Sequence, residues 1–245
     1  MVDLYQFYAF LKHFVGTKKV LGEVDNEILS SLNSNTCFYC FEEIEGYRRN
    51  LLKNDKEINV NDLGAGSKFF KNSKRKVKDI AKYSLKSSYY AQLLFRISNY
   101  LRAQTIVELG TSLGLTTSYL AKASSKGIVY SIEGCENTAK IAINTFQNLK
   151  VGNVELRIGD IKDKLPELIG EIGSIDLALV DGNHCGEATL RYFELLLKRS
   201  CSNTIIVFDD IYWSKSMSDT WRVIRNHERV KGSVDLFQLG MVLIK

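Results

Sequence analysis

From residue 105 onward, short β-branched runs alternate with amphipathic stretches, and this alternation constrains the fold of the 245-residue chain more than any other feature. It is typical of parallel strands joined by crossover helices. The buried runs are 105–109, 128–132, 154–158, 175–180 and 204–208. Helical patterns lie between them near 115–124, 136–148, 163–169 and 185–198. The alternation therefore predicts an α/β fold built on a mostly parallel sheet.

Two further apolar runs, 234–238 and 241–244, follow near the end of the sequence. Only Leu239 and Gly240 separate them, and so short a connection permits a hairpin but excludes a helical crossover. We therefore expect the last strand to be antiparallel and the sheet to have seven strands.

The first hundred residues have a different character, because their apolar residues repeat at helical spacing. The pattern runs through residues 4–15, 40–52 and 80–101, with no convincing strand. We predict a helical extension over residues 1–100, attached to a ligand-binding domain over residues 101–245. Structural packing is the simplest role for the extension. Two others remain open, a cap over the carboxyl edge of the sheet and a homo-oligomer contact.

The net charge of +5 lies entirely in the N-terminal part, where residues 1–100 hold 16 Lys and Arg against 11 Asp and Glu. Six of the eleven residues from Lys68 to Lys78 are basic. Such a segment suits a phosphate-bearing or acidic partner, and it equally suits a solvated helix face.

The sequence gives no sign of a membrane span or an export signal, because no apolar run approaches the roughly 18–20 residues that cross a bilayer. The five cysteines are an odd number, so reduced thiols are expected. Cys37 and Cys40 form a single CxxC without a second pair, which argues against a zinc site. We therefore predict a cytoplasmic protein.

The turn after the first of these strands contains two glycines, in Glu108-Leu-Gly-Thr-Ser-Leu-Gly114. In an open parallel sheet, ligands bind outside the carboxyl ends of the strands, where the strand order reverses. Gly110 and Gly114 carry no Cβ, so the backbone can turn tightly there and approach a ligand closely. The glycines alone fit any nucleotide-binding α/β protein.

Two acidic residues narrow the choice of cofactor. Glu133 ends the second strand, where its carboxylate can accept hydrogen bonds from both ribose hydroxyls of a nucleoside. Glu108 points at the glycine turn and suits a cationic amino-acid group better than a pyrophosphate, which it would repel. The turn also lacks the third glycine of the G-x-G-x-x-G dinucleotide fingerprint. These features favour S-adenosylmethionine (SAM) over NAD.

Four segments resemble the successive motifs of class I SAM-dependent methyltransferases in order and spacing: Val107-Glu-Leu-Gly-Thr-Ser-Leu-Gly114, Tyr130-Ser-Ile-Glu133, Gly159-Asp160 and Asp176-Leu-Ala-Leu-Val-Asp181. The resemblance covers roughly residues 100–245 and implies a Rossmann-like sheet. It also implies cofactor contacts, with the methionine part surrounded by Gly110, Thr111, Ser112 and Gly114, the ribose held by Glu133, and the adenine near Asp160. Asp160 has a second interpretation, as the N-cap of the next helix.

A second glycine-containing segment, Asn61-Asp-Leu-Gly-Ala-Gly-Ser67, imitates the cofactor turn. A basic stretch follows it, rather than an amphipathic helix and a strand that ends in an acid. We interpret the Gly64-Ala65-Gly66 loop as a substrate or lid loop.

Acidic residues follow the fourth and fifth strands, with Asp181 three residues before His184 and then the pair Asp209 and Asp210. Three carboxylates that converge on a pocket repel one another unless a cation joins them. Oxygen ligands select a hard ion, so we predict Mg²⁺ bound by Asp181, Asp209 and Asp210, with Asp181 also bordering the cofactor. A metal-free site, in which Asp209 and Asp210 orient the substrate or cap the next helix, remains the alternative.

His184 is the predicted general base, because an imidazole can take the proton of a hydroxyl as its oxygen attacks the methyl group. Its alternative role is to cap the helix that follows or to support the metal. His13 and His227 lie in helical patterns without acidic partners at useful spacing and are interpreted as structural. Tyr212 and Trp213 could line an apolar substrate pocket or pack in the core.

The acids and the histidine resemble those of metal-dependent O-methyltransferases, namely the macrolide-sugar enzymes, the related cephalosporin-hydroxylase-type enzymes and the catechol type. The chain departs from the catechol type in two places. That type has Asp-Asn where this chain has Asp209-Asp210, and a lysine near the first metal ligand where this chain has His184. The second departure favours histidine as the base.

The resulting prediction is SAM-dependent methyl transfer to a hydroxyl oxygen of a small molecule, assisted by Mg²⁺. RNA 2′-O-methylation and an NAD(P)-dependent oxidoreductase remain alternatives. Enzymes that methylate the bases of nucleic acids are disfavoured, because they carry characteristic proline motifs and the single proline, Pro166, lies in neither context.

Overall fold

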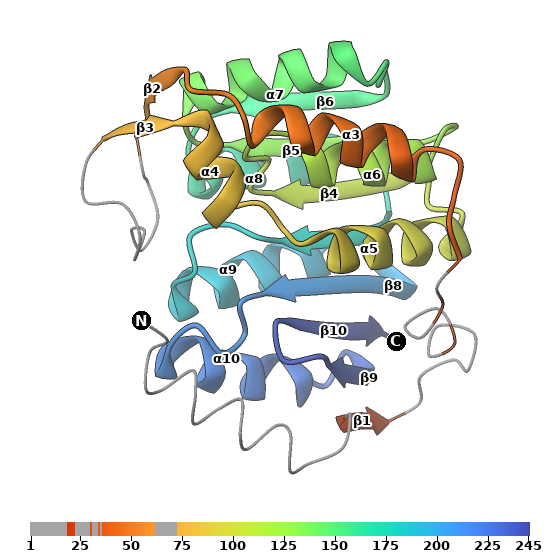
Figure 1. Ribbon diagram of the computed structural model, residues 1–245. Coiled ribbons are helices and arrows are strands. Elements are labelled where there is room, and N and C mark those ends of the chain that lie inside the picture. The colour runs from red at the N-terminus through yellow and green to blue at the C-terminus, as the bar shows by residue number, and fades with distance from the viewer. Residues whose placement is uncertain (1–18, 23–29, 31–33, 35, 62–72) are drawn as a thin grey trace.

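The computed structural model describes residues 19–22, 30, 34, 36–61 and 73–245, and its main feature is an eight-stranded sheet between two layers of helices (Figure 1). The seven predicted strands are β4 (Thr105–Leu109), β5 (Ile128–Glu133), β6 (Val154–Ile158), β7 (Ile175–Val180), β8 (Ser200–Asp209), β9 (Val230–Asp235) and β10 (Leu239–Ile244). They are hydrogen-bonded in the order β6-β5-β4-β7-β8-β10-β9. The first five in this order are parallel, and β10 is antiparallel to both of its neighbours, so the predicted fold is confirmed.

The part of the chain before residue 105 contributes strands that the sequence did not predict. β1 (Lys19–Gly22) pairs antiparallel with β9 and extends the sheet, while β2 (Glu57–Asn59) and β3 (Lys74–Lys76) form a separate two-stranded ladder. The expectation of no strand in this part was therefore wrong. Elements of three or four residues are too short to show the alternating pattern, and β3 consists only of basic residues.

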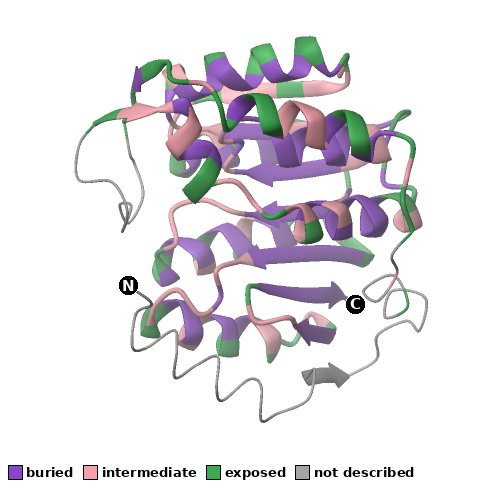
Figure 2. Ribbon diagram, in the orientation of Figure 1, coloured by how far each residue is buried: buried purple, intermediate pink, exposed green. Residues whose placement is uncertain are grey.

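The helices form two layers. On one face of the sheet lie α8 (Ile161–Glu171), α9 (Gly186–Leu197) and α10 (Lys215–Arg225), around a core that includes Leu165, Phe193 and Trp221. On the other face lie α5 (Ser88–Leu101), α6 (Leu115–Ala123) and α7 (Glu136–Asn148), with α3 (Phe41–Leu51) packed against α6 (Figure 1). The central strands are buried, and exposed residues gather on the outer sides of the helices (Figure 2).

The N-terminal helices share a third hydrophobic core with the domain that follows. Its members come from α3, α4 (Val77–Tyr83), α5, α6 and α7, and they include Phe41, Ile80, Phe95, Tyr119 and Ile141. The helical extension is thus packed against the sheet domain. The exact division at residue 100 stays a prediction.

Three local features differ from the sequence prediction. The apolar pattern of 80–101 is broken by a loop over residues 84–87, between α4 and α5. The helix expected after Asp210, α10, was given no bounds from the sequence, although Met217, Trp221 and Ile224 are buried at helical spacing. The turn of the last hairpin lies at residues 236–238 and not at Leu239-Gly240, because the Asp235 side chain accepts a hydrogen bond from the Phe237 backbone N–H and closes the turn earlier.

Some predicted features lie outside the described residues. They are His13, the apolar pattern of residues 4–15, the Gly64-Ala65-Gly66 loop, and Lys68 and Lys71 of the basic segment. Within the described ranges, no helix has the length and apolar character that a membrane span requires.

The strand order reverses beside β4, because β5 and β6 follow on one side of it, whereas β7 and β8 follow on the other. The loops after these strands diverge there and leave a crevice at the carboxyl edge of the sheet. The predicted cofactor and catalytic residues all lie on these loops or at the ends of these strands.

Candidate active site

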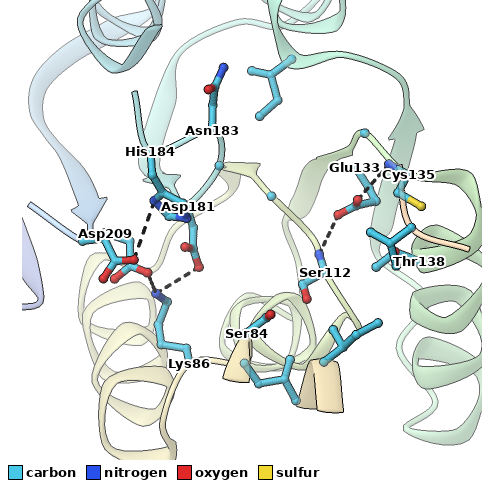
Figure 3. A pocket seen from close by; sticks show the side chains of 18 of the residues that line it. Ser84, Lys86, Ser112, Glu133, Cys135, Thr138, Asp181, Asn183, His184 and Asp209 are labelled. Atoms are coloured by element: carbon cyan, nitrogen blue, oxygen red, sulfur yellow. Dashed lines mark hydrogen bonds and ion pairs between the residues drawn. The ribbon is translucent and has the colours of Figure 1, made fainter. Parts of the chain in front are cut away.

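A cavity of about 460 Å³ opens at this carboxyl edge, and most of the predicted site residues line it (Figure 3). Those that do are Gly110, Ser112, Glu133, Asp160, Asp181, His184, Asp209 and Asp210. Trp213 lines the cavity too, whereas Tyr212 donates a hydrogen bond to Asp235 and stacks on Phe237. The N-terminal part closes one side through residues 84–87 and through Asn61 and Arg75 beside the β2–β3 ladder. The N-terminal part thus borders the cavity, and its role as a cap over the sheet edge stays a prediction.

The glycine turn is fixed by close packing. Gly110 has φ +101°, and a Cβ at this position would collide with the backbone carbonyl of Asp181. Its N–H donates to the carbonyl of Ile132 in the neighbouring strand, at 2.9 Å. Gly114 has φ +79° and lies against the Phe146 ring, so it also needs glycine. The turn is held tightly enough to present its backbone to the cavity.

Glu108 and Thr111 lie beneath this turn and are not among the residues that line the cavity. Glu108 is fully buried, and its Oε2 accepts hydrogen bonds from Thr117 Oγ1 at 2.5 Å and from Ser131 Oγ at 2.6 Å. Burial raises the pKa of Glu108 to about 7, although these two hydrogen bonds act to lower it. Glu108 thus lies under the cofactor turn, and its predicted contact with the amino group of SAM stays a prediction.

Glu133 joins the turn after β4 to the turn after β5. Its carboxylate accepts the Ser112 backbone N–H at 2.8 Å and the Cys135 backbone N–H at 2.9 Å (Figure 3). Close by, Thr138 lines the cavity with a buried hydroxyl oxygen that has no hydrogen-bond partner among the described residues. This side of the cavity therefore presents the Glu133 carboxylate, with the buried Thr138 hydroxyl in its wall, and a carboxylate at this place suits a nucleoside.

Asp160 takes the N-cap position that the sequence allowed, and its contact with the adenine stays a prediction. It is the N-cap of α8, where its side chain accepts the Lys162 backbone N–H at 3.0 Å, and it also lines the cavity. The capping bond fixes the carboxylate at the end of β6, on the side of the cavity where Glu133 lies.

On the opposite side, Lys86 lies between two of the predicted metal ligands. Its Nζ is 3.0 Å from Asp181 Oδ2 and 2.6 Å from Asp209 Oδ2 (Figure 3). The Lys86 side chain is only 4% exposed, so this is a buried ion-pair cluster. The cation that joins two of the three carboxylates is thus an ammonium group, from the loop between α4 and α5.

The charges in this cluster are strongly coupled. Burial and the negative charge of Asp209 raise the pKa of Asp181 well above its usual range. Burial acts to raise the pKa of Asp209 as well, but Lys86 and a hydrogen bond from Asp181 outweigh it and hold the pKa below its usual range. For Lys86, burial acts to lower the pKa, and the two carboxylates outweigh it and raise the pKa. The Lys86 ammonium thus stabilises the negative charge of the Asp181–Asp209 pair, and burial opposes the charge on each of the three groups.

This arrangement does not fit the predicted magnesium site. The space between Asp181 and Asp209 is taken by the Lys86 ammonium, and an ion placed there would meet a like charge. No group of three or more His, Cys, Asp or Glu side chains arranged to hold a metal ion occurs in the described part of the chain. We therefore derive no catalytic step from a metal.

The loop that carries Lys86 is anchored by helix α3. Arg48 donates from Nη1 to the backbone carbonyl of Lys86 at 2.9 Å, and from Nε to Glu45 at 2.8 Å. Glu45 also accepts hydrogen bonds from Ser88 at 2.6 Å and from Tyr119 at 2.7 Å. The N-terminal extension thus positions a charged group of the site.

His184 lies beside the same cluster, with Nδ1 3.8 Å from Asp210 Oδ2 and its ring 5.9 Å from that of Trp213. His184, Asn183 and Asp210 all have positive φ values, between 45° and 73°. Non-glycine residues adopt this conformation at an energetic cost, and they cluster at functional sites. The capping interpretation of His184 finds no support, because Cys185 is the N-cap of α9 and no side chain caps that helix.

Nothing in the sequence singled out Lys86 as a site residue. It is one of 33 basic residues, it belongs to no motif, and it lies in a helical pattern that showed no break by glycine or proline. The usable signal was the excess of carboxylates at the sheet edge, which called for a cation but could not distinguish a metal from an ammonium group.

Comparisons with known proteins agree with this fold. Residues 107–211 match a family described as a methyltransferase domain. The chain is 28% identical over 127 residues to a catechol O-methyltransferase of Mycobacterium tuberculosis, a match that covers 51% of this chain and 56% of that protein. It is 30% identical over 125 residues to the catechol O-methyltransferase of Niastella koreensis, covering 50% and 54%. The match thus spans a little over half the length of these relatives.

Solved structures share the fold. An O-methyltransferase of tomaymycin synthesis from Streptomyces achromogenes, in complex with SAM, has a TM-score of 0.59 at 20% identity, over 66% of this chain and 82% of that one. The O-methyltransferase from Bacillus cereus, in complex with S-adenosylhomocysteine (SAH), has a TM-score of 0.58 at 20% identity, over 86% and 93%. The chain therefore has the fold of class I SAM-dependent methyltransferases.

Proposed function

We propose that this protein is a SAM-dependent O-methyltransferase that acts on a hydroxyl group of a small molecule. One observation carries the proposal: a single cavity joins the glycine turn and Glu133 on one side to Lys86, Asp209 and His184 on the other. A methyl donor and a hydroxyl acceptor need such a pair of facing subsites. The curated relatives, both named catechol O-methyltransferase, support oxygen as the acceptor atom.

The residues on the first side fit SAM. Glu133 holds the ribose, Gly110 and Ser112 border the methionine part, and Asp160 borders the adenine. Two features of this structure support the assignment: the close approach that Gly110 permits and the unpartnered Thr138 hydroxyl in the cavity wall. When bound, SAM supplies a sulfonium methyl group, which an oxygen takes while the sulfur keeps the electron pair of the broken C–S bond and leaves as SAH.

The residues on the second side hold and deprotonate the acceptor. The Lys86 ammonium stabilises the negative charge that develops on the acceptor oxygen. His184 takes the hydroxyl proton as the C–O bond forms, and the Asp210 carboxylate at 3.8 Å stabilises the imidazolium that results. Trp213 forms an apolar wall beside the imidazole. The cavity of about 460 Å³ lies within the roughly 300–1,000 Å³ that small-molecule sites span.

Calorimetry and product analysis together test this function. We expect SAH and SAM to bind with a stoichiometry of one and NAD not to bind. Binding of NAD without SAH would reject the proposal in favour of an oxidoreductase. Incubation with SAM carrying a labelled methyl group should then label small hydroxylated aromatics and leave RNA unlabelled. Label in RNA alone would move the assignment to 2′-O-methylation.

A further inference from the structure

The side of the cavity that holds Lys86, Asp209 and His184 is here called the acceptor side, and its cation is a lysine rather than a metal ion. The loops after β7 and β8 bring Asp181, Asp209 and Asp210 to one wall of the cavity. Such a set of carboxylates is stable only with a positive charge beside it. In this structure the charge is the Lys86 ammonium, 3.0 Å from Asp181 and 2.6 Å from Asp209.

Burial and anchoring distinguish this lysine from a surface ion pair. Its side chain is 4% exposed, and those of Asp181 and Asp209 are 20% and 16% exposed. Its backbone carbonyl is held by Arg48, which is itself fixed by Glu45. Long side chains on surfaces lose much of the benefit of an ion pair to solvent and to entropy, whereas a buried and anchored one is held in place.

The hydrogen-bonding capacity of the ammonium group indicates its further use. A lysine has three N–H donors, and the described residues accept two of them, through Asp181 and Asp209. Lys86 also lines the cavity. Among the described residues no acceptor is seen for its third N–H, which is therefore available to a ligand in the cavity.

We propose that Lys86 replaces a divalent metal ion in this site and that its third N–H binds the acceptor oxygen. Asp181 and Asp209 then hold the ammonium in place of a metal. Methyl transfer proceeds without Mg²⁺, and the hydroxyl proton goes to His184 as the C–O bond forms.

The replacement has a consequence for substrate choice, which rests on the proposed function. A metal ion with several open positions can bind two neighbouring oxygens of an acceptor, as in a vicinal diol. One remaining N–H binds one oxygen. We therefore expect a phenol with a single hydroxyl to be accepted as well as its ortho-dihydroxy counterpart, whereas a metal site would favour the dihydroxy compound.

Metal binding can be measured without any acceptor, by electron paramagnetic resonance with Mn²⁺ as the probe and SAH-loaded protein. We expect the free Mn²⁺ signal to stay unchanged when wild-type protein is added. Loss of the signal with wild-type protein, together with its return in Asp209→Asn, would place a metal in this site and overturn the proposal.

Activity gives the second readout. Excess EDTA should leave the wild-type methyl transfer rate unchanged, and Lys86→Gln should lower it by roughly 10²–10³-fold while SAH binding is retained. The matched control is Lys82→Gln, an exposed lysine four residues away that does not line the cavity, and we expect it to keep the wild-type rate. A wild-type rate in Lys86→Gln, or loss of wild-type activity in EDTA, would refute the role of Lys86.

The two proposals fail in different ways. If the protein binds SAH but methylates no hydroxyl, the proposed function fails, and the Mn²⁺ measurement still tests the cation. If Lys86→Gln does not fold, as shown by loss of SAH binding, the wild-type Mn²⁺ and EDTA results decide the question.

Discussion

Replacing Glu108 with glutamine should change how the stability of the protein depends on pH. Glu108 is fully buried beneath the cofactor turn, and its Oε2 accepts hydrogen bonds from two neutral hydroxyl groups, those of Thr117 and Ser131. Burial raises its pKa from 4.5 to about 7. The folded state therefore holds this proton more tightly than the unfolded state does.

The sign and the size of the effect follow from these two values. The stabilisation from the Glu108 proton is fully present below about pH 4.5, and it is lost as the pH rises from about 4.5 to 7. The difference of about 2.5 in pKa corresponds to roughly 3 kcal/mol of unfolding free energy. Glutamine has the same shape and does not titrate, so Glu108→Gln lacks this loss.

Urea unfolding of both proteins at a series of pH values measures the effect. Glu108→Gln should gain about 3 kcal/mol relative to wild type between pH 4.5 and pH 7.5, because the other titrating groups cancel in the difference. Glu57→Gln, at an exposed position, controls for the loss of one negative charge. A constant difference across this range, or a relative loss of stability as the pH rises, would refute the argument that Glu108 is protonated.

Three further substitutions test the two sides of the cavity. Gly110→Ala should lower the unfolding free energy by at least about 2 kcal/mol, since it places a Cβ at φ +101° against a carbonyl; unchanged urea unfolding would contradict this. Glu133→Ala should weaken SAH binding about 10–100-fold in calorimetry. Glu136→Ala, at an exposed position, is its control, and equal SAH affinity of the two variants would remove the ribose assignment. His184→Gln should lower kcat roughly 10²–10⁴-fold with SAH affinity unchanged. His227→Gln, which affects a histidine beside Glu194, is its control, and wild-type turnover by His184→Gln would exclude the base role.

The fold was predictable because its signals are local and repeated. Each of the strands β4 to β8 has a helix after it, and the order of such units fixes a parallel sheet. The strand β6 was predicted to be buried, but it lies at the edge of the sheet and alternates apolar with charged residues, so none of its residues is buried. The turn at 236–238 was predicted at Leu239-Gly240, because residues 234–238 were read as one apolar run although Asp235, whose side chain closes the turn, lies within it. β2 and β3 are held by pairing with each other and leave no pattern in either segment alone.

The site residues that belong to sequence motifs could be predicted. The site residue that only tertiary contacts bring to the cavity could not. Gly110 and Glu133 follow strands at a fixed spacing, so their place at the sheet edge follows from the topology. Lys86 reaches the same edge from a separate loop, 95 residues before Asp181 and 123 before Asp209, and only packing brings these residues together.

The need for a cation was a correct physical inference, and the choice of Mg²⁺ followed from counting oxygen ligands without knowledge of Lys86. An ammonium group and a metal ion both stabilise the negative charge of neighbouring carboxylates. Distinguishing them requires the position of every basic side chain near the cluster, which one sequence does not give.

The central claim is methyl transfer from SAM to oxygen. Its most direct test is ¹³C NMR of the products formed from SAM with a ¹³C-labelled methyl group and a panel of hydroxylated aromatics, with protein that binds SAH. We predict that the label appears as a methoxy carbon on an acceptor. Label found on nitrogen, sulfur or carbon, with no methoxy product, would contradict it.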